Sequence, residues 1–555
     1  MARAAAIIIF SFLLLSGFLV EADNVVIRQV CSATRYPSSC ESAFSRDGRW
    51  QKASAQGLVE GMTAMAAQRS RAALVDAQTL TTGVAPAAND MNLTTLAEGC
   101  MEILDLAEHY VRVSNASMAT APLEDIQAWL SGALTQSFDC YYSLTKFQSS
   151  TSLTRSSTLA FVANMTDRLN TTVELISNAL ALTDARLTFG PDATLWRPPP
   201  ESREEQLRRL AMPQFPTWIT NDDRAIVFAD AAKPATKLVV NVTVALGSAE
   251  PSIQAAVDKA PSWSPKRFVI YIKAGVYKET VHIPKEKINL SFLGDGTNVT
   301  VITGSLHVGI PGITTRSSAT VAVTGAGFMA WGITFENTAG PEQHQAVALR
   351  VESDRSAFQA CSILGHQDSL YTHSLRQFYK DCTIAGTVDF IFGNSAAVFQ
   401  TCKIVVRVRN ITEGGSSTST LTAQGRTDPG QNTALVFQNC SVDGNAAYKA
   451  LHQANPARHH VYLGRPWKTY SRTVFLGSYL SQIVEPQGWL PWNGSFALDT
   501  LLDAEYGSYG PGGTNLSQRI SWSTQLSFQQ AQRFSAQQVL QADAWLPATT
   551  IPYSP

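Results

Sequence analysis

Two aspartates occupy the same position in a sequence repeat and could act as a pair of catalytic carboxyl groups. Asp368 follows Cys361 by seven residues, and Asp389 follows Cys382 by seven residues. If the repeats stack as coils, the two Cα atoms lie roughly 4.8 Å apart, the spacing of neighbouring strands. Close carboxylates repel each other, so one tends to keep its proton while the other stays ionised. The pair could therefore supply one acid and one nucleophile or base.

The residues around the two aspartates favour this chemistry over a purely structural role. Aspartates in turns usually make only local hydrogen bonds to the backbone. Here Gln367 directly precedes Asp368, and Asp389 lies between apolar residues in the segment 386–393. An amide donor next to one carboxyl group and a dry environment around the other are features of a catalytic site.

The phrase that carries these positions, aromatic-x-x-Cys-x-Ile or Val, recurs with a period near 20 residues. Its copies occupy residues 358–363, 379–384, 399–404 and 437–442. A fixed period of this length indicates stacked coils, and alternating β-branched and aromatic residues indicate strands. We therefore expect an all-β domain at 222–555, a right-handed parallel β-helix with a short helix at 252–260 as a cap. A leucine-rich-repeat horseshoe has a similar period, but its leucine–asparagine phrase is absent.

Composition excludes several other classes of protein. The chain has 555 residues, of which 45% are hydrophobic and 16% charged, so two or more globular domains are expected. Its net charge of −1 gives no indication of nucleic-acid binding. The sequence contains no CxxC pair, so we predict no metal site and no cofactor. It also lacks the G-x-S-x-G turn of serine esterases.

Residues 1–22 have the pattern of a secretory signal peptide. Arg3 supplies the positive charge, an apolar run covers 4–20, and small residues at 20–22 suit cleavage. An uncleaved anchor is the alternative, but the run is short for a membrane span. We expect a secreted protein with no membrane contact after cleavage. Asn-x-Ser/Thr sequons, candidate glycosylation sites, include Asn92, Asn115, Asn164, Asn170, Asn241, Asn298 and Asn493.

The N-terminal region, 23–184, is predicted to be an all-α four-helix bundle. Residues with high helix propensity recur at helical spacing in 54–78, 93–114, 122–142 and 154–182. Cys31 and Cys40 are close enough in sequence for a local disulfide, and Cys100 and Cys140 lie on adjacent predicted helices. Four cysteines allow three connectivities, and the sequence alone does not choose between them.

Residues 185–221 are predicted to link the two domains. The segment contains two proline-rich stretches, which cannot continue a helix, and a densely charged run at 201–209 that is typical of an exposed linker. Arg208 and Arg209 form a dibasic step in this segment. Because proteolysis concentrates in flexible segments, this step is a candidate processing site.

Several phrases of the C-terminal region resemble the signature blocks of plant pectin methylesterases. The resemblance covers roughly 265–525 and includes GFMAWGITFENTAGP, GHQDSLY, GTVDFIFGN, LTAQGR and LGRPW. The cysteine spacing of the N-terminal region resembles the invertase and pectin methylesterase inhibitor family. That family is a four-helix bundle with two sequential disulfides, and it precedes many plant pectin methylesterases as a pro-region. Residues 208–210 resemble the family's dibasic-Leu-Leu processing site, with Ala211 in place of the second leucine.

The resemblance implies a reaction and roles for individual residues. The substrate would be methyl-esterified homogalacturonan, and the reaction would release methanol and leave free carboxylates. Asp389 matches the family's nucleophile, which forms an acyl-enzyme anhydride. Asp368 matches the general acid, which later acts as base for the hydrolytic water. Gln367 matches the residue that stabilises the oxyanion, with Gln345 as a second donor.

Other positions would bind substrate. Arg465 matches the arginine that holds the nucleophile, and Trp467 matches an aromatic platform for a sugar ring. The residues implied to line the cleft are Thr315, Tyr371, Val388 and Phe392. Tyr371 and Phe392 are equally explained as packing residues. The family further implies a monomer that acts in the cell wall, with a processing protease and its own pro-region or a separate inhibitor as protein partners.

Three questions stay open at this stage. The β-helix could belong to a polysaccharide lyase or hydrolase instead of an esterase. It could also be catalytically dead, with the N-terminal domain acting as an inhibitor or polysaccharide-binding module. The cysteines of the repeat could form a disulfide, Cys382–Cys402 or Cys402–Cys440, or remain a ladder of thiols that includes Cys361.

Overall fold

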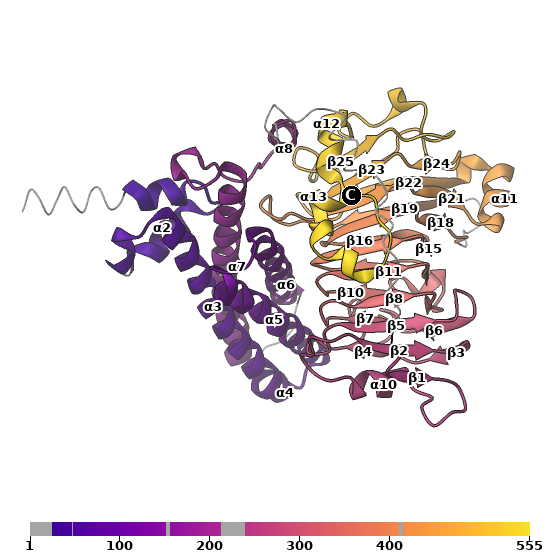
Figure 1. Cartoon of the computed structure of the whole chain (residues 1–555), viewed down its shortest axis with the longest axis horizontal. Coiled ribbons are helices and arrows are strands. Elements are labelled where there is room, and N and C mark those ends of the chain that lie inside the picture. Colours follow the sequence, from indigo (N-terminus) through magenta and orange to yellow (C-terminus); the bar gives the residue numbers. More distant parts are fainter. Residues whose placement is uncertain (1–24, 47, 151–155, 213–238, 410–414) are drawn as a thin grey trace, which may run out of the picture. The chain divides into compact units, whose positions relative to one another are not determined.

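The computed structural model describes residues 25–46, 48–150, 156–212, 239–409 and 415–555. The predicted signal peptide lies outside these ranges. The chain divides into two compact units, which are described separately (Figure 1). The N-terminal unit comprises Met1–Pro200 with Pro429–Gln431, and the C-terminal unit comprises Glu201–Asp428 with Asn432–Pro555.

The N-terminal unit contains the four long helices that the sequence predicts. They are α3 (Ala55–Thr79), α5 (Met91–Ser117), α6 (Leu123–Ser150) and α7 (Ser156–Phe189), and the shorter helices are α2 (Pro37–Ser45) and α4 (Ala85–Ala88). Apolar residues spaced three or four apart, such as Leu93, Ala97, Cys100 and Leu104, form the buried core. Within the described residues, no helix combines the length and the apolar character needed to cross a membrane.

Two disulfides join sequential cysteines in this unit. Cys31 bonds to Cys40, and Cys100 bonds to Cys140. The second bond links α5 to α6. Of the three connectivities that the sequence left open, the structure therefore contains the sequential one.

The C-terminal unit is a parallel β-helix built from three sheets (Figure 1). Sheet A contains β1 (Val242–Val244), β2 (Phe268–Ile272), β5 (Leu290–Gly294), β8 (Met329–Trp331), β11 (Ser356–Gln359), β14 (Arg376–Lys380), β17 (Ala396–Gln400), β20 (Ala434–Gln438), β23 (Arg472–Leu476), β25 (Leu502–Tyr506) and β26 (Thr524–Gln525). Sheet B contains β3 (Gly275–Lys278), β6 (Thr300–Gly304), β9 (Thr334–Asn337), β12 (Ser362–Leu364), β15 (Thr383–Gly386), β18 (Lys403–Val406), β21 (Ser441–Gly444) and β24 (Tyr479–Leu480). Sheet C contains β4 (Val281–Ile283), β7 (Val321–Val323), β10 (Leu349–Val351), β13 (Leu370–Thr372), β16 (Val388–Gly393), β19 (Ser417–Gln424) and β22 (His459–Pro466).

The repeated phrase forms the interior of this β-helix. Its aromatic residues stack ring on ring, with centroids 4.9 Å apart for Phe358 and Tyr379, and 4.7 Å apart for Tyr379 and Phe399. The residue before each cysteine has a left-handed backbone and turns the chain from sheet A to sheet B. These residues are Ala360, Asp381, Thr401 and Asn439. The period of the sequence is therefore the length of one coil.

The disulfide predicted for Cys382 and Cys402 is absent: both are free, buried thiols, as are Cys361 and Cys440. Each Sγ lies 3.3–3.5 Å from carbonyl oxygens of its own coil and of the preceding one. Parallel neighbours in register keep their side chains about 4.8 Å apart, wider than the Cβ separation of about 3.8 Å in a disulfide. Stacking therefore produces the thiol ladder that was the alternative.

Short helices cover parts of the β-helix. The predicted cap is α10 (Ile253–Lys259), whose Ile253, Ala256 and Val257 are buried in the interior core. A second apolar cluster forms outside sheet A, where Phe378 and Val436 pack with residues of the C-terminal segment. The remaining helices are α11 (Ala446–Ala454), α12 (Phe528–Ala531) and α13 (Ala536–Leu540).

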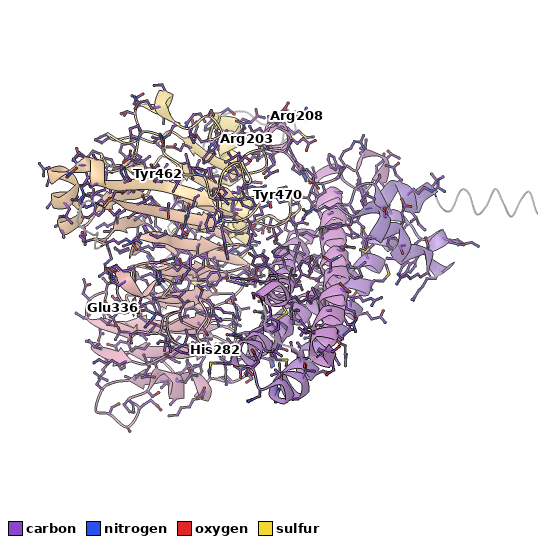
Figure 2. All side chains as sticks on the ribbon, turned by 180° about the vertical axis from the view of Figure 1, so that it is seen from behind. Arg203, Arg208, His282, Glu336, Tyr462 and Tyr470 are labelled. Carbon is purple, nitrogen blue, oxygen red and sulfur yellow. A yellow bond between two sulfur atoms is a disulfide. The ribbon has the colours of Figure 1, made fainter. Side chains whose placement is uncertain are left out.

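The charged run at 201–209 is a helix in the C-terminal unit, not an exposed linker. Helix α8 (Arg203–Leu210) begins with a capping box between Ser202 and Glu205. Gln206 is 2% exposed; its amide donates to the Thr500 carbonyl at 2.7 Å. Charged side chains occupy the opposite face, and that of Arg208 is 67% exposed. The run looked like a linker because its charges lie on one face of a helix whose other face is buried (Figure 2).

Candidate active site

The two predicted aspartates lie side by side at the start of consecutive sheet C strands. Asp368 is in the turn before β13, and Asp389 is the second residue of β16. Leu370 pairs with Ile391, so the two aspartates, 21 residues apart in sequence, occupy equivalent positions. The Asp368 amide donates to the Val388 carbonyl at 3.1 Å. The stacking expected from the repeat is therefore present.

Both aspartates have a backbone conformation that is unusual for residues other than glycine. The φ angles are 64° for Asp368 and 48° for Asp389. Against β19, the pairing of β16 shifts between Val388 and Ile391, which forms a β-bulge with Asp389 inside it. Bulges redirect side chains, and strained residues of this kind cluster at functional sites. The fold thus directs the Asp389 carboxylate by breaking the regular ladder.

Arg465 holds the Asp389 carboxylate from the next-but-one coil. Its Nε donates to Oδ1 at 2.8 Å and its second guanidinium nitrogen to Oδ2 at 2.6 Å. This two-pronged geometry is the strong form of an arginine–carboxylate pair. A third donor is the hydroxyl group of Thr420, at 2.6 Å from Oδ1. The contacts favour an ionised Asp389 with a fixed orientation.

Asp368 has the opposite electrostatic environment. Burial raises its pKa well above the ordinary range, and the negative charge of Asp389 adds to the increase, whereas Arg465 opposes it. Within the described residues, no hydrogen bond to the Asp368 carboxyl group is found. A neutral carboxyl group next to a fixed carboxylate can donate a proton while its neighbour acts as a nucleophile.

Gln345 and Gln367 are also neighbours on consecutive coils. They form a parallel bridge, and the Ala346 amide donates to the Gln367 carbonyl at 3.2 Å. Both side chains therefore start from adjacent points of the backbone, and Gln367 directly precedes Asp368. Two neutral amide groups at this edge of sheet C can donate hydrogen bonds to an oxygen that becomes negative during a reaction.

The predicted aromatic residues gather next to these polar groups. Tyr371 and Phe392 stack at a centroid distance of 4.2 Å, and Phe392 meets the edge of Trp467 at 6.0 Å. Val388 is half-buried beside Asp389. Thr315 lies in the turn before β7, where its carbonyl accepts from Ser318 at 2.8 Å. In the described part of the chain it makes no contact with the aspartates.

Sequence reasoning missed two residues of the site. Thr420 contacts Asp389 directly, and Trp492 lies under the Arg465 guanidinium, 4.3 Å from its carbon to the ring centroid. The signal for Thr420 is its place two residues before the LTAQGR phrase ends its first alternation, on a strand with threonine at every second position. The count of 20 residues does not reach it because the coil between β18 and β19 is longer. Trp492 has no comparable signal.

The neighbouring histidine does not provide a charge. Burial, followed by the charge of Arg407, lowers the pKa of His366 to about 4. At neutral pH its imidazole is therefore neutral. The charges next to the aspartate pair come from Arg465 and Asp389.

Comparison with known proteins identifies the family. The sequence profile described as "Pectinesterase" matches residues 241–543, more than half of the chain. The chain belongs to the pectinesterase family. A second profile, described as "Plant invertase/pectin methylesterase inhibitor", matches residues 25–182. This pectinesterase family member is thus a carboxylic ester hydrolase preceded by an inhibitor-family domain.

Relatives of both kinds cover the chain. The "Probable pectinesterase/pectinesterase inhibitor 64" of Arabidopsis thaliana is 39% identical over 530 residues, which are 94% of this chain and 85% of that protein. "Pectinesterase 2" of the same plant is 37% identical over 565 residues, 97% of this chain and 90% of that protein. The structure of the pectin methylesterase from carrot matches with a TM-score of 0.54 and 48% identity. That match covers 58% of this pectinesterase family chain and 99% of the carrot chain.

Proposed function

We propose that the C-terminal unit hydrolyses the methyl esters of homogalacturonan, with Asp389 as nucleophile and Asp368 as general acid and base. One observation carries the proposal: a carboxylate held by Arg465 lies next to a buried carboxyl group whose pKa is raised. Ester hydrolysis through a covalent intermediate needs both forms at the same time. The family and the carrot structure support the choice of pectin as substrate.

The first half-reaction forms the acyl-enzyme. Asp389 attacks the ester carbonyl carbon, and the carbonyl oxygen takes the negative charge. Gln345 and Gln367 donate their amide hydrogens to this oxygen. The bond to the methoxy group then breaks, Asp368 gives its proton to the departing methanol, and an anhydride joins Asp389 to the galacturonate carbonyl.

The second half-reaction releases the free acid. Asp368, now ionised, takes a proton from a water molecule as that water attacks the anhydride carbonyl. The bond to Asp389 breaks, so Asp389 returns to the carboxylate form that Arg465 stabilises. Asp368 ends with the proton it started with. The cycle consumes one water and produces one methanol and one carboxylic acid.

The aromatic group at the edge of sheet C provides a surface for the polymer. Trp467 packs partly exposed against Tyr371 and Phe392, which are buried. Aromatic faces suit the apolar faces of sugar rings. We assign Trp467 to sugar stacking and the other two to support of that ring, while Val388 and Thr315 line the same strand edge.

The remaining features concern the life of the whole chain. We propose that it is secreted as a monomer to the cell wall, and that a protease separates its inhibitor-like region at the step Arg208–Arg209. Two disulfides in the N-terminal unit support an oxidising compartment. Light scattering of the purified chain tests the monomer, and N-terminal sequencing of the secreted protein tests the cleavage.

The decisive experiment measures methanol released from highly methylated pectin. A chain that starts at Glu201 keeps α8 and the whole C-terminal unit. We expect methanol release by this chain, none by the Asp389→Ala variant, and no shortening of the polymer by either. Polymer shortening would identify a lyase or hydrolase instead. A folded wild-type unit that releases no methanol would return attention to a catalytically dead β-helix, the reading that the family assignment does not favour.

A further inference from the structure

Thr420 makes two hydrogen bonds to the same residue, Asp389. Its Oγ1 accepts from the Asp389 backbone N–H at 3.0 Å, and it donates to the Asp389 carboxylate at 2.6 Å. The side chain is 2% exposed. Thr420 lies on β19, where its backbone pairs with Val388, the last residue before the bulge. The hydroxyl group thus serves the backbone N–H of the bulged residue.

The two bonds fix the direction of the hydroxyl proton. A threonine hydroxyl has one proton and accepts through its lone pairs. Because the Asp389 N–H occupies the acceptor side, the proton is directed at Oδ1. Oδ1 therefore accepts from both Thr420 and the Arg465 Nε, whereas Oδ2 accepts only from the second guanidinium nitrogen. In the described part of the chain, Oδ2 is the oxygen with the free lone pair.

We propose that Thr420 is a positioning residue that selects Oδ2 of Asp389 as the attacking atom. By holding Oδ1 and the backbone together, Thr420 prevents rotation of the carboxylate and presents Oδ2 to the ester. In the reaction, Oδ2 bonds to the carbonyl carbon, the bond to the methoxy oxygen breaks, and methanol leaves with the proton of Asp368. The inference rests on the proposed function and adds a residue that does not touch the substrate.

The test compares three variants of the full chain by methanol release and thermal unfolding. Thr420→Val keeps the shape of the side chain but removes the hydroxyl group, and Thr420→Ser keeps the hydroxyl group. Thr422→Val is the matched control: Thr422 is a buried threonine on the same strand whose hydroxyl donates to the Leu463 carbonyl at 2.9 Å. It tests the cost of losing a buried hydroxyl bond away from Asp389.

We expect Thr420→Val to lower kcat roughly 10- to 100-fold, the effect of one hydrogen bond to a charged group, with KM changed less than about two-fold. Thr420→Ser should recover most of the loss, and Thr422→Val should keep kcat near the wild-type value. A purely structural role would lower the melting temperature and the amount of active protein equally in both valine variants.

Equal kcat for Thr420→Val and wild type would overturn the inference, as would equal loss in the two valine variants. If Thr420→Val does not fold, Thr420→Ala provides the measurement, with the same expected drop in kcat and the same criterion. The Asp389→Ala variant separates this inference from the proposed function. Activity in Asp389→Ala would overturn the mechanism itself, whereas an inactive Asp389→Ala with a fully active Thr420→Val would overturn only the role of Thr420.

Discussion

Two corners of the same coils contain left-handed residues in stacked positions, but they differ in what those residues do. The first corner joins sheet A to sheet B and contains Ala360, Asp381, Thr401 and Asn439. The second joins sheet B to sheet C and contains Asp368, with Asp389 just inside the next strand. At the first corner four residue types serve equally, because only the backbone turn matters. At the second, both residues are aspartates.

The difference lies in the contacts that reach each corner from neighbouring coils. Asp381 is exposed and accepts a hydrogen bond from Thr401, which is the next residue of the same corner. Asp389 is 6% exposed and receives donors from β19 and β22, after a bulge has broken the ladder. Regular stacking thus provides a stable frame, and the departure from it provides the chemistry.

The largest expected effect separates the two corners by one matched substitution. Asp389→Asn removes the nucleophilic charge and should lower methanol release by a factor on the order of 10⁴ or more, as removal of a catalytic nucleophile does. Asp381→Asn, at the first corner, should leave release within about two-fold of wild type. Initial rates on methylated pectin measure both. Comparable losses would mean that the second corner has no special chemical role.

The stacked rings should determine stability instead of activity. Phe399 lies inside the β-helix between Tyr379 and Phe437, with centroids 4.7 and 4.6 Å away. Phe399→Ala should lower the free energy of unfolding by about 3–5 kcal/mol, the cost of a large cavity. Phe528, which is 56% exposed, provides the control, and Phe528→Ala should cost less than about 1 kcal/mol. Denaturant unfolding measures both, and equal costs would contradict the interior stack.

The amide donor next to Asp368 should affect turnover more than binding. Gln367→Ala removes one donor to the developing oxyanion and should lower kcat roughly 10²- to 10³-fold, with little change in KM. Gln359 is the comparison residue before the first corner, where its side chain accepts from Trp331 at 3.1 Å. Gln359→Ala should keep kcat within a few-fold. A rise in KM alone for Gln367→Ala would assign that residue to substrate binding.

The smallest effect concerns a buried carboxyl group that lacks the contacts of Asp389. Asp503 on β25 is 1% exposed, and in the described residues neither of its oxygens has a hydrogen-bond partner. Burial raises its pKa well above the ordinary value, so folding favours the neutral acid. Its contribution to stability is complete below the ordinary pKa of 3.8 and is lost as pH rises through the raised value in the folded state.

We therefore expect Asp503→Asn to match wild type in melting temperature near pH 3.5 and to exceed it as pH rises. The variant carries an amide that never ionises, so the difference between the two proteins should increase towards alkaline pH. Melting curves at several pH values measure this difference. A constant difference across the range would show that Asp503 does not change its ionisation on folding.

The periodic parts of the fold could be predicted from sequence because burial imposes the period. The aromatic-x-x-Cys phrase predicts the coils, and from them the stacking of Asp368 on Asp389. Helical spacing predicts the four long helices of the N-terminal unit, which α3, α5, α6 and α7 confirm with some extension at their ends. In each case an apolar residue has to return to the interior at a fixed interval.

The non-periodic parts could not be predicted in the same way. Thr420 reaches Asp389 across a coil whose length departs from the repeat, so counting residues does not find it. The free state of Cys382 depends on the parallel register, which only the folded chain defines. The roles of Asp389, Arg465 and Trp467 were expected from resemblance to a family, and composition alone would not have assigned them.

Helix α8 has a consequence for any cut at the dibasic step. Arg533 donates to the carbonyl groups of Leu210 and Met212, and Gln530 donates to that of Leu207. These contacts hold the backbone on both sides of Arg209 in place, and Gln206 anchors the helix below it. A cut after Arg209 would leave most of α8 on the N-terminal fragment while its docking site stays on the other. Cutting the chain and parting the two fragments would then be separate events, the second governed by how tightly one helical turn binds.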